Sequence, residues 1–338
     1  MASKLSKPLI KRPAIRIHVL INYTILTILC CTILANAMLN ICEQLAPRLY
    51  HLQSQPEMGC NGHTELCNRR FSNITQIASH DAAFVGILPM DNQNVEVTSQ
   101  LNAGIGFLQT QTRLNGEGTL SLCHTNCGMK DAGSLQDFLR TIITWLEKHP
   151  KEVVTLLLTN GDYVSIDYFK EAFNSSGAQE HAYVPFTNHT ASILDSWPTL
   201  GELITAEKRL VAFLDSGANA SVPFILPEFE YFWETPFDTT NPDFPQCLID
   251  RPGDLDEAPA VAAQRMYIMN HFLDTNILGM DLPDRYDAKR TNAATGNGSI
   301  GAQADLCQRL HGRPPNGVLV DYFDRGSVFK AQNALNGL

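Results

Sequence analysis

The sequence is poor in charge, and the charge that it has is mostly negative. Asp, Glu, Lys and Arg make up 18% of the 338 residues, and the formal net charge is −10. After the first twenty residues, no more than two basic residues stand together. Proteins that bind nucleic acids neutralise phosphates with clustered lysine and arginine. We therefore expect no nucleic-acid partner.

The sequence also lacks the P-loop motif G-x-x-x-x-G-K-[S/T], which excludes the nucleotide hydrolases that bind phosphate through that loop. It has no internal repeat and no low-complexity tail. Hydrophobic residues make up 44% of the chain, which is enough for a sizeable core. At this length the composition predicts one large globular domain, and we expect a monomer.

The first 42 residues resemble a targeting segment. An apolar stretch runs from His18 to Leu39, no acidic residue precedes Glu43, and Ala35 and Ala37 are small enough for signal-peptidase cleavage. The basic residues ahead of this stretch are Lys4, Lys7, Lys11, Arg12 and Arg16. The stretch is also long enough to span a bilayer, so an uncleaved signal-anchor is the alternative. In both cases residues 43–59 form a linker, and we expect residues 60–338 to face the exterior or a secretory lumen.

Glycosylation triplets and cysteines agree with an oxidising compartment. Asn-x-Ser/Thr acceptors occur at Asn73, Asn174, Asn188, Asn219 and Asn297. Six of the cysteines allow many connectivities, and proximity along the chain favours Cys60–Cys67, Cys123–Cys127 and Cys247–Cys307. Cys42 is left over. A structural zinc site is the competing interpretation, but no C-x-x-C or paired-histidine spacing supports it. We predict no metal and no cofactor.

Short β-rich runs alternate with helical patterns through the rest of the chain. The predicted strands are 74–80, 105–112, 120–124, 153–159, 210–214, 266–271 and 318–322, with a weaker one near Tyr183. The predicted helices are 135–148, 166–173, 199–206 and 328–335, and residues 223–259 are interpreted as an elaborated loop. This alternation predicts an α/β fold with a parallel sheet. About eight strands favour a distorted TIM (β/α)8 barrel over an open doubly wound sheet.

Polar residues follow most of the predicted strands, and barrel enzymes place their chemistry at these strand ends. The candidates are His80, Asp81, Gln109, Gln111, Arg113, His124, Asn160, Asp215, Asn270, His271 and Asp321. Two histidines and several acids at one barrel end make a set suited to general acid–base catalysis, because histidine titrates near neutrality. His124 lies inside the Cys123–Cys127 pair, and Asp81 follows His80. We interpret His271 chiefly as a residue that orders the barrel rim.

Four segments carry a resemblance to a known family. Ser79–Phe84, Thr98–Ile105, Leu122–Cys127 and Val318–Phe323 resemble the PLC-like phosphodiesterase superfamily, in particular secreted fungal relatives of bacterial phosphatidylinositol-specific phospholipase C. The resemblance spans roughly residues 60–336. It implies a distorted barrel that cleaves the phosphodiester of an inositol phospholipid. It further implies that His80 is the general base, that His124 protonates the leaving group, and that Asp321 and Asp81 support these two steps.

The second predicted strand departs from the pattern of that superfamily. Metal-independent members carry an arginine there, and calcium-dependent members carry acids, whereas this chain has Gln109 and Gln111. Glutamine brings no charge and is a poor substitute for a carboxylate ligand of calcium. Loss of the arginine removes a stabilising charge from the phosphate. Arg113 lies two residues further along the same strand face and is the candidate to replace that charge.

Three functions are therefore compared. The first is a metal-independent phosphoric diester hydrolase whose partner is a phospholipid or glycolipid headgroup at a membrane surface. The second is a catalytically weakened relative that binds phosphoinositol or glycolipid headgroups, which the two glutamines favour. The third is a glycosidase, which needs a pair of carboxylates across a cleft and could draw on Glu228, Glu230 and Glu234.

Overall fold

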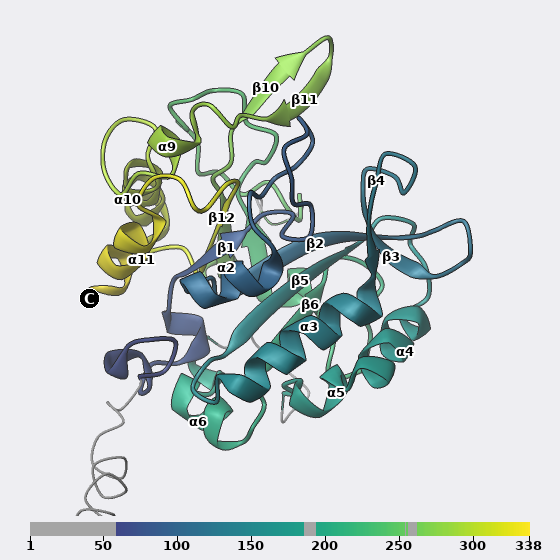
Figure 1. Ribbon diagram of the computed structural model, residues 1–338. Helices are drawn as coiled ribbons and strands as arrows, with labels where there is room; N and C mark the ends of the chain where they lie inside the picture. The colour runs from purple at the N-terminus through teal and green to yellow at the C-terminus, as the bar shows by residue number, and fades with distance from the viewer. Residues whose placement is uncertain (1–58, 186–193, 254, 256–261) are drawn as a thin grey trace, which may run out of the picture. The chain divides into compact units, whose positions relative to one another are not determined.

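Eight parallel strands form the sheet on which the fold is built (Figure 1). The computed structural model describes residues 59–185, 194–253, 255 and 262–338. In chain order the eight strands are β1 (Gln76–Ser79), β2 (Phe107–Leu114), β5 (Val154–Asn160), β6 (Leu210–Leu214), β7 (Leu226–Pro227), β8 (Phe232–Glu234), β9 (Met266–Asn270) and β12 (Gly317–Val320).

The strands follow one another around the sheet in chain order, and β12 returns to pair with β1. Every ladder along this path is parallel. Among the described residues no ladder joins β7 to β8, and helix α7 (Glu228–Tyr231) links these two strands instead. The sheet is thus a curled barrel that stays open at one seam, which confirms the predicted distorted TIM barrel.

Side chains alternate between two hydrophobic layers along each strand, as the pleat requires. Inside the barrel, Ala78, Phe107, Phe213 and Phe232 belong to one buried cluster, with Phe213 and Phe232 rings 5.0 Å apart. The alternate residues, such as Leu108 on β2, pack outward in a second cluster that includes the surrounding helices. The aromatic layer fills the barrel below the carboxyl ends of its strands. Polar side chains occupy those ends.

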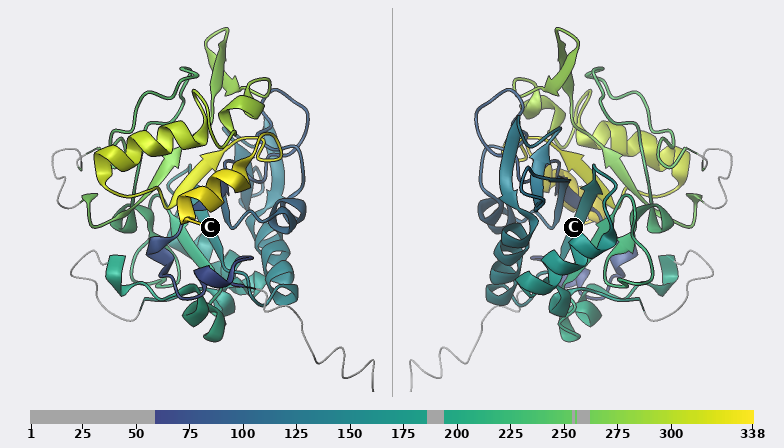
Figure 2. Two further views of the ribbon diagram at one scale, coloured as in Figure 1. Left: turned by 90° about the vertical axis from the view of Figure 1, so that its left-hand side faces the viewer. Right: turned by 90° about the vertical axis from the view of Figure 1, so that its right-hand side faces the viewer.

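Most of the longer helices cover the outside of the sheet (Figures 1 and 2). The longer helices are α2 (Val97–Ala103), α3 (Leu135–Lys148), α4 (Ile166–Ser176), α6 (Leu200–Thr205), α10 (Ile300–His311) and α11 (Val328–Asn336). The exception is α6, whose buried Leu200 and Leu203 belong to the inner cluster. The shorter elements are α5 (Ala178–His181), α9 (Ala288–Thr291), η1 (Thr64–Leu66), η2 (Phe71–Asn73) and η3 (Leu194–Ser196). Helix α3 begins as predicted, because the Ser134 side chain accepts a hydrogen bond from the Asp137 amide. Helices α2 and α10 were not predicted.

The predicted strand at 120–124 exists, but it is not a barrel strand. It forms β3 (Leu120–His124), which runs antiparallel to β2 and pairs with β4 (Lys130–Ser134), a strand that was not predicted. His124 therefore lies on a two-strand extension of β2 and not at the end of a parallel barrel strand. The weaker strand near Tyr183 is reduced to a single bridge between Ala182 and Leu210.

The interpretation of 223–259 as an elaborated loop is wrong in its first part. This segment contains β7, α7 and β8, and the two strands are only two and three residues long. Strands of that length carry no readable alternation of polar and apolar residues. A further antiparallel hairpin, β10 (Asp274–Ile277) and β11 (Met280–Pro283), follows β9 and projects beyond the barrel strands in Figure 1.

The three predicted disulfides, Cys60–Cys67, Cys123–Cys127 and Cys247–Cys307, are confirmed. The predicted glycosylation sites Asn73, Asn174, Asn219 and Asn297 are all exposed, and their modification stays a prediction. The targeting segment, nearly all of the linker, Cys42 and Asn188 lie outside the described residues. No helix in the described part of the chain is both long and apolar enough to cross a membrane.

Gly296, Gly298 and Gly301 spell the pattern G-x-G-x-x-G before α10, and two of them, Gly298 and Gly301, pack closely against neighbouring backbone. A dinucleotide site needs this pattern directly after a strand, whereas here α9 is the element that precedes it. Gly298 has a φ of +68°, and a Cβ there would lie 2.1 Å from the carbonyl oxygen of Pro242. The glycine is therefore required by the close approach of the 242 loop.

Candidate active site

A cavity of about 430 Å³ opens at the carboxyl ends of the barrel strands. Its lining includes seven of the candidate residues: His80, Asp81, Gln109, Gln111, His124, Asp215 and Asn270. Asp321, which follows β12, lies directly behind His80. These side chains come from positions far apart in the sequence, and the parallel barrel brings them together because all its strands end at the same rim.

His80 is fixed on two sides. Its Nδ1 lies 2.9 Å from Asp321 Oδ1, and its ring stacks on Phe272 with centroids 3.8 Å apart and an interplanar angle of 5°. Asn92 donates a 3.0 Å hydrogen bond to the same Asp321 oxygen. An Nδ1–H that donates to Asp321 leaves Nε2 to face the cavity. Burial alone would lower the pKa of His80, but the charges of Asp321 and Asp81 outweigh it and raise the pKa to about 9.

Asp81 lies between the two histidines. Its Oδ2 is 3.7 Å from His80 Nε2 and 3.5 Å from His124 Nε2. The side chain is almost completely buried, and burial raises the pKa of Asp81 against the opposing charges of His80 and His124. Its backbone has a φ of +46°, a region that non-glycine residues adopt only under the constraint of their surroundings.

The two glutamines of β2 supply that constraint. Gln109 Oε1 accepts a 2.8 Å hydrogen bond from the Asp81 amide, and Gln111 Nε2 donates a 2.7 Å bond to Asp81 Oδ2. Gln111 Oε1 also accepts from the Thr125 amide at 3.2 Å. Both glutamines line the cavity, but each binds Asp81, so the structure gives them a positioning role in addition to the predicted substrate contact.

His124 is held by its loop and by an aromatic neighbour. The Cys123–Cys127 disulfide closes the loop immediately around it, and Thr125 has a φ of +59°. The edge of Phe84 meets the His124 ring at 79°, with centroids 4.9 Å apart. The imidazole is therefore directed into the cavity by covalent closure and by packing.

Three predicted substrate-binding residues do not line the cavity, and each has another partner. Arg113 forms an ion pair with Asp162 at 2.6 Å, because β2 continues past the end of β5 at this position. Asn160 closes its own loop through a 2.9 Å hydrogen bond to the Val164 carbonyl. His271 is fully buried and bonds Gln303 and Thr291, at 2.6 and 2.8 Å, which fits its interpretation as an ordering residue.

The opposite wall of the cavity contains residues that the sequence did not assign to this site. Glu228 follows β7, Glu234 ends β8, and Arg251 lies in the segment after β8. Arg251 Nε donates a 3.0 Å hydrogen bond to Glu234, and Nη2 contacts the same oxygen. Burial, together with the charge of Glu234, raises the pKa of Glu228 well above its ordinary value. Glu230 is exposed and lies outside the lining.

The cavity is lined by seven carboxyl groups, namely Asp81, Asp215, Glu228, Glu234, Asp238, Asp274 and Asp281. Arg251 is the one lysine or arginine among the described lining residues. Burial raises the pKa of Asp215 and Asp238, and burial together with the charge of Asp321 raises the pKa of Asp274 to about 7. Asp274 therefore titrates near neutral pH, which limits the negative charge of the cavity.

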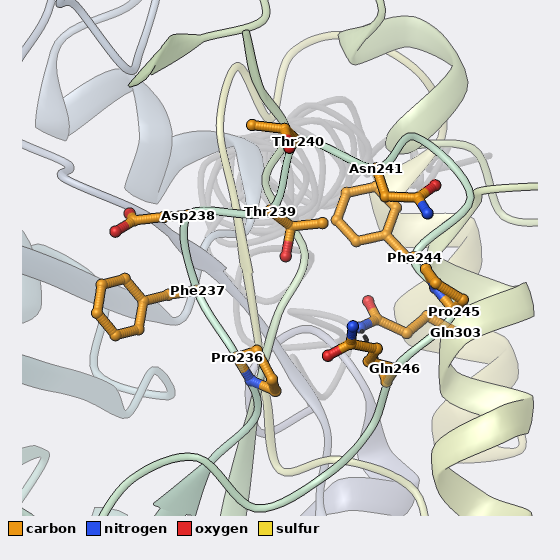
Figure 3. A pocket seen from close by; sticks show the side chains of 10 residues that line it. All are labelled: Pro236, Phe237, Asp238, Thr239, Thr240, Asn241, Phe244, Pro245, Gln246 and Gln303. Atoms are coloured by element: carbon orange, nitrogen blue, oxygen red, sulfur yellow. Dashed lines mark hydrogen bonds between the residues drawn. The ribbon is translucent and has the colours of Figure 1, made fainter. Parts of the chain in front are cut away.

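A second hollow of about 250 Å³ adjoins the first, and Phe237 and Asp238 line both (Figure 3). In Figure 3 these two side chains point away from Gln246 and Gln303. They form part of the partition between the hollows. Elsewhere, Cys123, Cys127 and Asp131 bring potential metal-ligand atoms together, but the disulfide leaves no thiolate to bind a metal.

The fold and the site together define a barrel of the phosphodiesterase class, with two histidines and supporting acids at its mouth. Residues 66–336 match the family PI-PLC X 1. The chain is 48% identical over 289 residues to PI-PLC X domain-containing protein 1 of Arthroderma benhamiae, covering 85% of this chain and 92% of that protein. It is 44% identical to an uncharacterized secreted protein of the same fungus, covering 82% of this chain and 64% of that one.

This protein belongs to the PI-PLC X family, as the sequence motifs predicted. Among solved structures, phosphatidylinositol-specific phospholipase C from Listeria monocytogenes matches with a TM-score of 0.51 and 15% identity, over 80% of this chain and 95% of that one. At that identity the match supports the barrel fold alone.

Proposed function

We propose that this protein is a secreted phosphoric diester hydrolase that cleaves a phosphoinositide-type phosphodiester by histidine acid–base catalysis, without a metal ion. The observation that carries the proposal is the placement of His80 Nε2 and His124 Nε2 within 4 Å of the same Asp81 oxygen. Two imidazoles across a gap of this kind can serve the attacking and leaving oxygens of one phosphorus atom. A relative that is named as a secreted protein supports the location.

In the proposed reaction, neutral His80 takes the proton of a ring hydroxyl, whose oxygen attacks phosphorus in line. Protonated His124 gives its proton to the leaving glycerol oxygen, and a cyclic phosphate is the product. Asp321 holds the His80 ring through Nδ1 and stabilises the imidazolium that forms. Asp81, whose Oδ2 lies within 4 Å of both Nε2 atoms, would support the proton transfer from His124.

The surface near the cavity supports a lipid substrate. The β10–β11 hairpin lends Asp281 and Pro283 to the lining, and its tip exposes Leu278 at 96% and Met280 at 54%. Ile87 is 90% exposed, and its loop is joined to the base of the hairpin where Arg285 donates to the Gly86 carbonyl at 2.9 Å. Exposed apolar side chains grouped at a rim are typical of surfaces that bind membranes.

A second candidate function is headgroup binding with little or no turnover. It is favoured by the engagement of Gln109 and Gln111 with Asp81 and of Arg113 with Asp162. Among the described residues, the sole arginine in the cavity lining is Arg251, on the wall across from the histidines. The glycosidase hypothesis fits less well, because Glu228 and Glu234 lie on the same wall of the cavity and Glu234 is paired with Arg251, whereas the two carboxyl groups of a glycosidase flank the bond that is cleaved.

The test offers phosphatidylinositol in detergent to the purified protein, with and without EDTA. We expect inositol cyclic phosphate to be released in both conditions, and His80→Ala and His124→Ala each to lower the rate at least about 100-fold. His181→Ala is the matched control, since His181 lies on α5, outside the cavity lining. Headgroup binding without turnover would favour the second candidate. Loss of turnover in EDTA would contradict the metal-independent mechanism.

A further inference from the structure

A loop between β1 and α2 reaches both histidines of the candidate site. It runs from Phe84 to Gln93 and is closed at its base, where the Asn92 and Gln93 amides donate to the Phe84 carbonyl at 3.0 and 3.1 Å. At the start of the loop, the edge of Phe84 meets the His124 ring. At its end, Asp91, Asn92 and Gln93 are each at most 1% exposed. These three consecutive polar side chains are therefore built into the structure, and each holds a different part of it.

Two of the three hold the His80 side of the site. Asn92 donates a 3.0 Å hydrogen bond to Asp321 Oδ1, the oxygen that also faces His80 Nδ1. Gln93 Nε2 donates to the carbonyl oxygens of His80 and Val320, at 2.8 and 3.0 Å. These bonds join the residues that end β1 and β12. They fix the backbone of His80 and the orientation of its acidic partner.

The third residue, Asp91, connects the loop to the hairpin that carries His124. Lys130 Nζ lies 2.7 Å from Asp91 Oδ1 and donates to the Val85 carbonyl at 2.9 Å. Lys130 stands directly opposite His124 in the β3–β4 ladder, and opposed residues of an antiparallel pair project from the same face. Both Asp91 and Lys130 lie outside the described lining of the cavity. Their ion pair can therefore act on a reaction only by way of the residues that it holds.

The Asp91 carboxylate has a partner on each oxygen. Oδ2 accepts a 2.7 Å hydrogen bond from the Leu88 amide, in addition to the contact of Oδ1 with Lys130. Gly86 leaves the space for this carboxylate, because a Cβ at Gly86 would lie 2.2 Å from Oδ2. The Asp91 side chain is 1% exposed, so loss of the ammonium would leave a buried anion without its cation. Such a loss is costly, and the hairpin or the loop has to move to relieve it.

We propose that Asp91 and Lys130 are positioning residues whose ion pair sets the separation of the two histidines. One side of this connection runs from His80 through Gln93 to Asp91, and the other runs from Lys130 across the ladder to His124. Misplacement of a catalytic group by about 1 Å can cost about 100-fold in rate. This inference rests on the proposed function, because it takes the two histidines to serve one reaction.

Steady-state kinetics on phosphatidylinositol in detergent compare the full protein with Lys130→Met. We expect kcat to fall about 10- to 100-fold and KM to change less than about threefold, because His124 moves while the substrate contacts stay. Lys130→Arg restores a cation within reach of Asp91 and should recover kcat to within about threefold of the wild type. Arg140→Met is the control, since it breaks an exposed ion pair with Asp137 on α3 and should leave kcat unchanged.

A double variant tests whether the two residues act as one unit. Asp91→Asn removes the charge but keeps an oxygen for the Leu88 amide, and it should lower kcat as Lys130→Met does. In Asp91→Asn/Lys130→Met, kcat should be at most about threefold lower than in Lys130→Met alone, because the second change removes an interaction that is already lost. Thermal unfolding verifies that each variant is folded, and Asp91→Asn carries the test if Lys130→Met does not fold. Multiplied losses in the double variant would contradict the shared role.

A crystal structure of Lys130→Met gives a measurement that does not depend on turnover. In the wild type, His124 Nε2 lies 3.5 Å from Asp81 Oδ2 and His80 Nε2 lies 3.7 Å from it. We expect the His124 distance to change by at least about 0.5 Å, because its hairpin lies outside the barrel, and the His80 distance to stay.

The two proposals fail separately. A displaced His124 in a protein that releases no cyclic phosphate would support the positioning role and reject the hydrolase. Wild-type kcat in folded Lys130→Met, or an unmoved His124, would overturn the positioning role alone. A tenfold rise in KM at unchanged kcat would also overturn it, since that result would assign Lys130 to substrate binding.

Discussion

Gln111 donates a 2.7 Å hydrogen bond to Asp81 and accepts one from the amide of Thr125. One side chain thus connects the residue that follows β1 to the loop that carries His124. In the sequence, Gln111 occupies a position at which members of the superfamily carry a charged residue. In the structure it joins the two parts of the candidate site that must keep a fixed separation.

We predict that Gln111→Leu lowers kcat by about 10- to 100-fold with little change in KM, because the variant releases both Asp81 and the His124 loop. Gln111→Glu should lose more, since a carboxylate beside Asp81 repels it and gives no donor. Steady-state kinetics on phosphatidylinositol in detergent measures both effects. Gln308→Leu, at an exposed position on α10, is the control. Gln111→Leu with wild-type kcat would refute the positioning role.

The pKa of His80, raised to about 9, predicts how activity depends on pH. The proposed base must be neutral, so kcat/KM should rise with pH through a value near 9. Asp321 favours the imidazolium, and its replacement in Asp321→Asn should therefore move this limb to lower pH. The amide still accepts a hydrogen bond, which preserves the ring orientation. A pH profile of kcat/KM for both proteins measures the shift, and a limb that moves upward would contradict the assignment of His80.

The parts of this molecule that the sequence predicted are those with a local signal. Helix α3 has a capping serine and a clear apolar face and was predicted correctly, as was the family, one of whose motifs surrounds His80. Glu228 and Glu234 were considered only for the glycosidase hypothesis and were not placed at strand ends, because β7 and β8 are too short to show a strand pattern. Arg113 was a candidate to reach the cavity because strand alternation gives the face on which a side chain lies. Alternation does not show whether a neighbouring carboxylate, here Asp162, forms an ion pair with it.

Removal of two different disulfides should affect stability and activity to different degrees. Loop-closure entropy predicts that loss of Cys247–Cys307, which spans 60 residues, costs about 4 kcal/mol, whereas Cys123–Cys127, which spans four, costs about 2 kcal/mol. We expect the Cys123→Ala/Cys127→Ala variant to unfold at a moderately lower temperature and to lose most activity, because the loop that holds His124 is released. The Cys247→Ala/Cys307→Ala variant should lose more thermal stability and keep most of its activity. Calorimetry and turnover assays compare the two.

The hairpin tip predicts a difference between lipid and soluble substrates. Leu278 is 96% exposed beside a cavity that the same hairpin helps to line. In Leu278→Asp, a carboxylate at the tip should oppose insertion into a bilayer interface, so binding to phosphatidylcholine vesicles containing phosphatidylinositol should fall severalfold. Hydrolysis of soluble inositol cyclic phosphate should stay unchanged, because Leu278 is not part of the cavity. Leu310→Asp, on α10, makes the same change at another exposed leucine and should leave vesicle binding intact. Equal losses in both variants would show that any added negative charge weakens vesicle binding. Unchanged vesicle binding in Leu278→Asp would show that the hairpin does not contact the membrane.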